Sequence, residues 1–197
     1  MSDVFNLLEN PSFMKHARTR LRPGKMLPVF IVFLVLSAMA FFGPLVWTQY
    51  VVGSNDMAQA GAISVYILWG LQGLALGLIG SSRAATSMGE EKESGMLESM
   101  RITPTSGVRR LIGHLFGGPI REYLIVAASV PFALGATLVA KLPIHLVLLA
   151  YLIGWVNVVF YHSFGLVAGL TAKNAKTASG TAVAFVIVLN VMLAPLT

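Results

Sequence analysis

The chain has no cysteine and few charged residues. Only 11% of its 197 residues are Asp, Glu, Lys or Arg, whereas a typical soluble domain has about 25%. The lack of cysteine excludes disulfide bonds and every zinc site built on thiolates. Since 56% of the residues are hydrophobic, the composition predicts a chain that folds in a lipid bilayer.

Patterns that would indicate catalysis or metal binding are also missing. The four histidines, His16, His114, His145 and His162, are scattered, with neither His-x-x-x-His nor paired carboxylate spacing, so the spacing predicts no metal site and no cofactor. No Gly-x-x-x-x-Gly-Lys-Ser/Thr phosphate loop occurs, and no Ser/His/Asp set has a recognisable local setting. We therefore expect no enzyme activity, and any ATP hydrolysis would belong to a partner.

Long apolar runs dominate the sequence. A helix needs about 20 mostly apolar residues to cross a bilayer, and five runs are long enough. Trp47 and Tyr50 suit an aromatic belt at the far end of the first run. We predict an all-α integral membrane protein, in which residues 1–26 form a basic entry segment and the rest is a transmembrane bundle. The predicted spans are residues 27–50, 60–81, 120–140, 145–170 and 178–195.

The cations lie almost entirely on one side of these spans. Thirteen of the fourteen Lys and Arg residues precede the first span, separate the second from the third, or follow the fourth, and only Lys141 falls on the other side. Positive loops are retained in the cytoplasm, so the N-terminus and the loop 83–110 are predicted to be cytoplasmic. Because the cations flank spans instead of lining an aromatic groove, nucleic acid binding is not expected. No cleavage motif follows the first run, so we expect it to stay in the mature chain.

The segment 10–22 predicts a short helix lying in the membrane interface. Asn10 can cap it, and Pro11 suits its first turn. A solvated juxtamembrane tail is the alternative. The expected apolar face is Phe13, Ala17 and Leu21, and the expected membrane-surface cations are Lys15, Arg18 and Arg22.

The loop 83–110 is the longest polar segment between two spans. Ser87-Met-Gly-Glu90 has the form of a capping box, and it predicts a separate helix over residues 90–101. On such a helix Met96, Leu97 and Met100 share one face, and methionine faces adapt to shallow grooves on partners. The segment is therefore a candidate docking helix, with a solvated connector as the alternative.

Polar residues and glycines inside the spans form two further candidate sets. Buried polar groups in a bilayer face the bundle interior or water, so they either contact a substrate path or bond neighbouring helices. Glycines four residues apart allow two helices to approach closely. The candidate path residues are Gln72, Asn157, His162, Ser163 and Asn190, and the packing pairs are Gly73 with Gly77 and Gly165 with Gly169.

Both cytoplasmic segments resemble a known family. The stretch RAATSMGEEKESGMLE at residues 83–98, continued by TPTS at residues 103–106, resembles the signature of type-2 ABC export permeases, and NPSFMKHARTRLR at residues 10–22 looks like the elbow of the same family. The resemblance implies a bacterial inner-membrane permease subunit that pairs with a second permease subunit and docks on a cytoplasmic ATP-binding subunit. The residues implied in docking are Arg83, Glu90, Glu91, Glu93, Met96, Leu97, Glu98, Met100 and Arg101.

The sequence departs from the family pattern at three places. Met96 stands where threonine is usual, His114 where lysine is usual, and no sixth span follows residue 197. The resemblance therefore leaves two functions open. The first is the membrane half of an ATP-driven exporter, and the second is a non-transporting scaffold or accessory subunit derived from such a permease. An intramembrane enzyme would need paired acidic or histidine residues within the spans, and these are missing.

Overall fold

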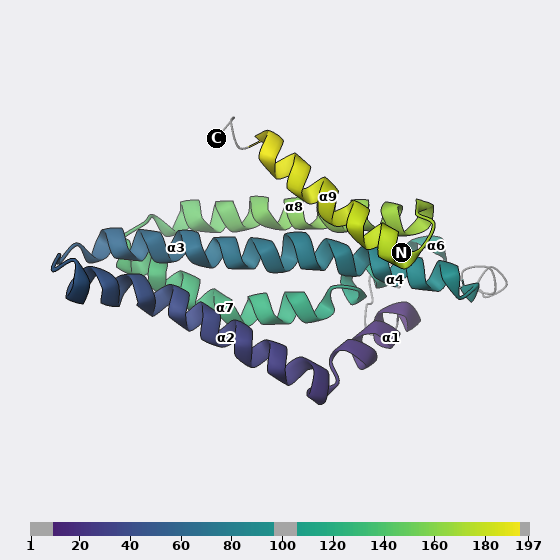
Figure 1. Cartoon of the computed structure of the whole chain (residues 1–197), viewed down its shortest axis with the longest axis horizontal. Helices are drawn as coiled ribbons and strands as arrows, with labels where there is room; N and C mark the ends of the chain where they lie inside the picture. Colours follow the sequence, from purple (N-terminus) through teal and green to yellow (C-terminus); the bar gives the residue numbers. More distant parts are fainter. Residues whose placement is uncertain (1–9, 97–105, 194–197) are drawn as a thin grey trace. The chain divides into compact units, whose positions relative to one another are not determined.

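The computed structural model describes residues 10–96 and 106–193, and every regular element within them is helical (Figure 1). Two of the elements, η3 and η4, are π-helical turns that continue the α-helix before them. In chain order the elements are α1 (Pro11–Arg20), α2 (Pro23–Val46), η3 (Trp47–Val51), α3 (Met57–Gly73), η4 (Leu74–Gly80), α4 (Ser81–Glu93), α6 (Gly107–Gly117), α7 (Ile120–Val139), α8 (Ile144–Thr171) and α9 (Ala175–Leu193).

Five helices are long and apolar enough to cross a membrane, which confirms that part of the prediction. The side chains of α2 show why lipid suits them, since Leu27, Val32 and Met39 are each more than half exposed. Exposed apolar surface of this extent is stable in hydrocarbon, not in water. The helices are Pro23–Val51, Met57–Glu93, Ile120–Val139, Ile144–Thr171 and Ala175–Met192.

The second of these helices corrects the prediction for the cytoplasmic loop. It runs without a break for 37 residues, or roughly 55 Å at 1.5 Å per residue, whereas the hydrocarbon core is about 30 Å thick. Its polar end therefore extends beyond the bilayer. Ser87 caps no helix, because it lies within α4 and its hydroxyl donates to the carbonyl of Ala84 at 2.8 Å.

The break comes instead after Glu93. Ser94 closes the last turn by donating to the carbonyl of Glu90 at 3.0 Å, and Gly95 has φ 67°. A left-handed glycine directly after a helix is the usual way to end it. Residues 90–93 thus belong to the last turn of α4, and a single helix over residues 90–101 is wrong. Leu97, Glu98, Met100 and Arg101 lie outside the described residues.

The chain divides into two compact units. The first, unit 1, comprises Met1–Arg22, Leu76–Glu122 and Asn157–Thr197, and the second, unit 2, comprises Pro23–Ala75 and Tyr123–Val156. Unit 2 has a core of small and branched side chains from α2, α3 and α7, among them Ala40, Leu68 and Ala136. Small residues at this core let the helix backbones approach closely, as membrane helices require.

Unit 1 is built on close packing between α4 and α8. A Cβ atom added at Gly165 would lie 2.5 Å from the carbonyl oxygen of Ser81, and one added at Gly169 would lie 2.6 Å from that of Ala85. No real Cβ fits at such distances, so the backbones meet here because both positions are glycine. The predicted pair in the fourth span thus lies at a close helix crossing.

The other predicted glycine pair behaves differently. A Cβ at Gly77 would make ordinary contacts of 3.8 Å with Tyr161 and Val186, and one at Gly73 would meet nothing within 4 Å. Gly73 is exposed, so the prediction that another described helix of this chain packs closely against Gly73 is wrong.

Candidate functional site

The N-cap residue of helix α1, Asn10, also bonds helix α6. The Oδ1 atom of Asn10 accepts hydrogen bonds from the backbone N–H groups of Ser12 and Phe13 at 3.1 and 3.3 Å. Its amide donates to the carbonyl of Arg109. Asn10 therefore caps α1, as the sequence predicts, and also satisfies a backbone group of a helix almost one hundred residues away.

Three ionisable side chains from α1, α4 and α6 meet in the interior of unit 1. His114 Nε2 lies 2.9 Å from Glu91 Oε2, and His114 Nδ1 lies 3.2 Å from His16 Nε2. All three residues are buried, with exposed fractions of 8% for His16, 2% for Glu91 and 0% for His114. Within the described residues this is the one group of three or more acidic or histidine side chains whose potential ligand atoms lie close enough, within 4.8 Å, to hold a metal ion.

A lysine at the protein surface pairs with the negative charge of Glu91. Lys15 Nζ lies 2.9 Å from Glu91 Oε1, and the lysine side chain is 45% exposed while that of Glu91 is 3% exposed. A buried carboxylate needs such a partner, because removing an isolated charge from water is costly. Burial, together with the nearby His114 and Arg20, lowers the pKa of His16 to about 4, so His16 is neutral at pH 7.

The next two residues of α4 bind the ends of two spanning helices. Lys92 Nζ donates to the carbonyls of Leu170 and Ala172, both at 2.8 Å, at the C-terminal end of α8. Glu93 Oε1 accepts from the backbone N–H of Ala175 at 2.6 Å, at the first residue of α9. The cation meets unpaired carbonyls and the anion meets an unpaired N–H group, which is the favourable polarity at both helix ends.

We call Glu91, Lys92 and Glu93 the α4 hub. Consecutive residues of a helix point about 100° apart, so three neighbours can reach three directions. Through them the end of α4 is bonded to α1, α6, α8 and α9. Because three consecutive residues bond one helix to four others, the arrangement suits a mechanical connection between these helices.

Several residues predicted to bind a partner lie elsewhere than expected. Glu91 is buried and ion-paired, so its carboxylate does not form a surface that is open to a partner. Glu93 is exposed, and its carboxylate accepts a hydrogen bond from the backbone N–H of Ala175. Glu90 is exposed, and Arg83 and Met96 are partly buried. The remaining predicted contacts, Leu97, Glu98, Met100 and Arg101, lie outside the described residues.

The three cations predicted to lie at the membrane surface differ in their contacts. Arg18 and Arg22 are exposed, as a role at the lipid surface requires. Lys15 is bonded to Glu91 and also lies 3.2 Å from Met96 Sδ. Its ammonium group therefore serves an intramolecular contact, because the last turn of α4 places a buried carboxylate beside it.

The predicted path residues are divided between the two units. Gln72 belongs to unit 2, where its amide donates to Ser129 and its carbonyl accepts from Tyr151. In unit 1 the buried His162 bonds the carbonyl of Leu76 at 2.8 Å. Asn190 donates to Tyr161 and Ser163 to the carbonyl of Val159, and Asn157 is exposed. Gln72, His162 and Asn190 thus join helices, the alternative role that the sequence leaves open.

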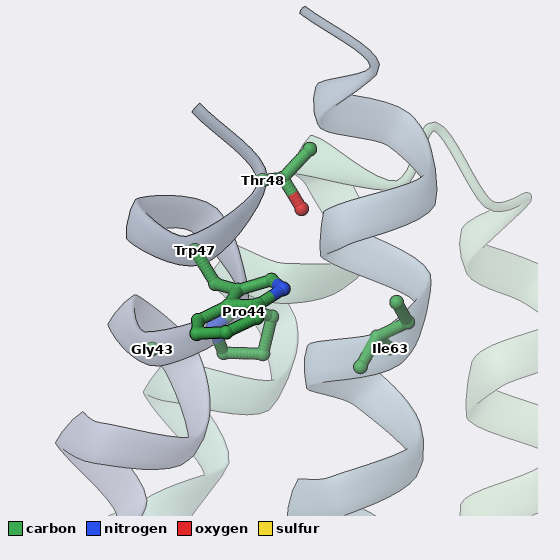
Figure 2. Close-up of a pocket in the computed structure, with 5 residues that line it drawn as sticks. All are labelled: Gly43, Pro44, Trp47, Thr48 and Ile63. Carbon is green, nitrogen blue, oxygen red and sulfur yellow. The ribbon is translucent and has the colours of Figure 1, made fainter. Parts of the chain in front are cut away.

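Unit 2 contains a pocket of about 410 Å³ near the end of the first span. Figure 2 shows Pro44 and Trp47 on one side of it and Ile63 of α3 on the other. The remaining lining residues are Gly43 and Thr48. With no ionisable group in its lining, the pocket suits an apolar occupant such as an acyl chain.

The sequence analysis missed both the hub and the histidine pair. His16 and His114 are 98 positions apart, and Lys92 reaches residues 78 and 80 positions away. Motif spacing detects ligands on one element, so it cannot detect residues brought together from three. The one available signal was the unusual histidine at position 114 within a basic segment.

Comparisons with known proteins assign no family. No family model matches the chain, and no curated protein and no solved structure is significantly similar to it. Its function has to be argued from its own residues.

Proposed function

We propose that this chain is the membrane subunit of an ATP-driven exporter of the type-2 ABC permease kind, located in a bacterial inner membrane with its N-terminus in the cytoplasm. The observation that carries the proposal is the α4 hub. A transporter driven by a cytoplasmic ATPase needs a rigid contact that passes movement from the docking loop to the spans. The hub is placed where such a contact is needed.

The hub stands directly before the loop that resembles the docking segment of the family. Because the loop is joined to the last turn of α4, a displacement of the loop acts on that turn. From there ion pairs and hydrogen bonds lead to α1 through Lys15, to α8 through Lys92 and to α9 through Glu93. Polar contacts of this kind hold a fixed geometry better than apolar packing alone, so the loop, α1 and two spans are expected to move together.

The proposed docking surface contains fewer residues than the sequence predicts. Since Glu91 and Glu93 are used internally, the proposed contact comprises the exposed Glu90, Met96 and the residues that follow in the loop. The ATP-binding subunit supplies hydrolysis, and a second permease subunit completes the pathway. Thirteen of fourteen cations on one side of the spans support the proposed orientation.

The test is recovery of the partner from native membranes. Glu98→Lys and Leu97→Asp should each reduce the amount of a co-purifying ATP-binding protein at least fivefold, because charge steers the encounter and the apolar face holds it. Gln59→Lys, a substitution at an exposed position in the first turn of α3, is the matched control and should leave recovery unchanged. Equal recovery from all four proteins would refute docking through this loop.

The alternative is a scaffold that does not transport. Internal use of Glu91 and Glu93 favours it, because a hub of this kind also stabilises a static bundle. In that case a stable complex would contain the chain and other membrane proteins but no nucleotide-binding subunit. Identifying the proteins purified with the wild-type chain separates the two functions.

A further inference from the structure

We infer that His16 and His114 form a binding site for one Zn²⁺ ion that joins α1 to α6. The inference is independent of the proposed transport function, since it concerns how the cytoplasmic helices are held together. Both histidines and the neighbouring Glu91 are buried in unit 1. The donors are imidazole nitrogens and oxygen, a set that suits zinc in the absence of thiolates.

The spacing of the two ring nitrogens fits a metal ion. Zinc binds imidazole nitrogen at about 2.0–2.1 Å in tetrahedral geometry, which places two ligand nitrogens roughly 3.3 Å apart. His16 Nε2 and His114 Nδ1 are 3.2 Å apart. The pair therefore needs little rearrangement of the backbone to share an ion.

Glu91 orients the second ligand. Its Oε2 atom lies 2.9 Å from His114 Nε2, so it accepts a hydrogen bond from Nε2–H, and the lone pair of Nδ1 is left for the ion. A carboxylate behind a metal-bound histidine fixes the tautomer in this way in many sites. When zinc enters, the proton between the rings moves from His16 Nε2 to His16 Nδ1, so no proton is released.

One further protein ligand for the ion can be identified. The Oγ atom of Ser87 lies 3.3 Å from His114 Nδ1, and water completes the tetrahedron. Arg20 is one unfavourable neighbour, and Lys15, which bonds the other oxygen of Glu91, is a second. Their positive charges oppose the ion and keep the affinity moderate.

The first experiment measures binding of Zn²⁺ alone to the purified full-length chain, prepared in detergent without a polyhistidine tag. Equilibrium dialysis followed by metal analysis should find one Zn²⁺ per chain, and Co²⁺ should give the visible absorption of a tetrahedral site. His16→Ala and His114→Ala should each abolish this binding. His145→Ala changes an exposed histidine at the start of α8 and should bind as the wild type does.

Two further variants separate loss of the site from loss of folding. Glu91→Gln should weaken Zn²⁺ binding by about 10- to 100-fold, the usual effect of removing the orienting carboxylate. Lys15→Gln should tighten it several-fold, and a folding defect cannot produce this gain. The inference is overturned if the wild type binds no Zn²⁺, if His16→Ala and His114→Ala bind normally, or if Lys15→Gln fails to tighten binding.

Discussion

The glycine contact between α4 and α8 gives the sharpest quantitative prediction. An added Cβ at Gly165 would lie 2.5 Å from the carbonyl oxygen of Ser81, about 0.9 Å closer than an ordinary contact. The obstacle is helix backbone, which cannot rotate away as a side chain would. Overpacking of this kind costs about 1–3 kcal/mol, so Gly165→Ala should reduce the free energy of unfolding by that amount before any gain in helix propensity.

The same helix offers a control for that gain. A Cβ at Gly154 would meet nothing within 4 Å, so Gly154→Ala keeps only the propensity advantage of alanine, about 1 kcal/mol. Gly165→Ala has the same propensity advantage, because both glycines lie in α8. Subtracting one unfolding free energy from the other therefore isolates the steric cost, which should be about 1–3 kcal/mol against Gly165→Ala.

The measurement is equilibrium unfolding in mixed micelles with increasing sodium dodecyl sulfate, followed by loss of helical circular dichroism. The two alanine variants and the wild type are compared under identical lipid and detergent conditions. If Gly165→Ala proves as stable as Gly154→Ala, the close approach of α4 and α8 is wrong.

Three other predictions concern the stability of the protein, its orientation in the membrane and the coupling of ATP hydrolysis to export. Glu91→Leu should cost about 1–3 kcal/mol of unfolding free energy because buried His114 loses its acceptor, whereas Arg18→Gln, at an exposed position of α1, should cost under about 1 kcal/mol; equal losses in the same unfolding assay would contradict the burial of Glu91. With an impermeant thiol reagent, Lys173→Cys should be labelled only from the cytoplasmic side and Asn55→Cys only from the other, and the reverse pattern would overturn the proposed orientation. In the proposed transporter, Gly77→Leu should separate ATP hydrolysis from export while partner recovery persists; loss of the complex itself would favour the scaffold.

The spans were predictable from the sequence because each is a long, predominantly apolar run, and a helix satisfies all of its backbone hydrogen bonds within such a run. The start of the predicted docking helix was not. The pattern from Ser87 to Glu90 has the form of a capping box. A capping box begins a helix only where the preceding residues are not already helical. Here the second span continues through it to Glu93, so the backbone N–H groups that a cap would satisfy already lie within a helix.

The α4 hub lay beyond sequence reasoning for a different reason. Glu91 and Glu93 were predicted to contact a partner, and Lys92 was given no role. Nothing local shows that Lys92 meets the end of α8 or that Glu93 meets the start of α9. Contacts of this separation depend on how helices pack, which a pattern along one helix does not encode. The glycine pair in α8 was identified correctly because its spacing lies on a single helix.

The most direct test of the account measures ATP hydrolysis by the complex of this chain with its co-purifying partner in lipid nanodiscs. The triple variant Glu91→Gln, Lys92→Gln and Glu93→Gln weakens every contact of the hub and leaves the loop sequence from Ser94 onward intact. We expect this variant to recover the partner as well as the wild type does, yet to lose the stimulation of ATP hydrolysis that the membrane subunit confers. Unchanged stimulation in a folded variant, or a stable wild-type complex without any ATP-hydrolysing subunit, would contradict the proposal that the hub couples an ATPase to the spans.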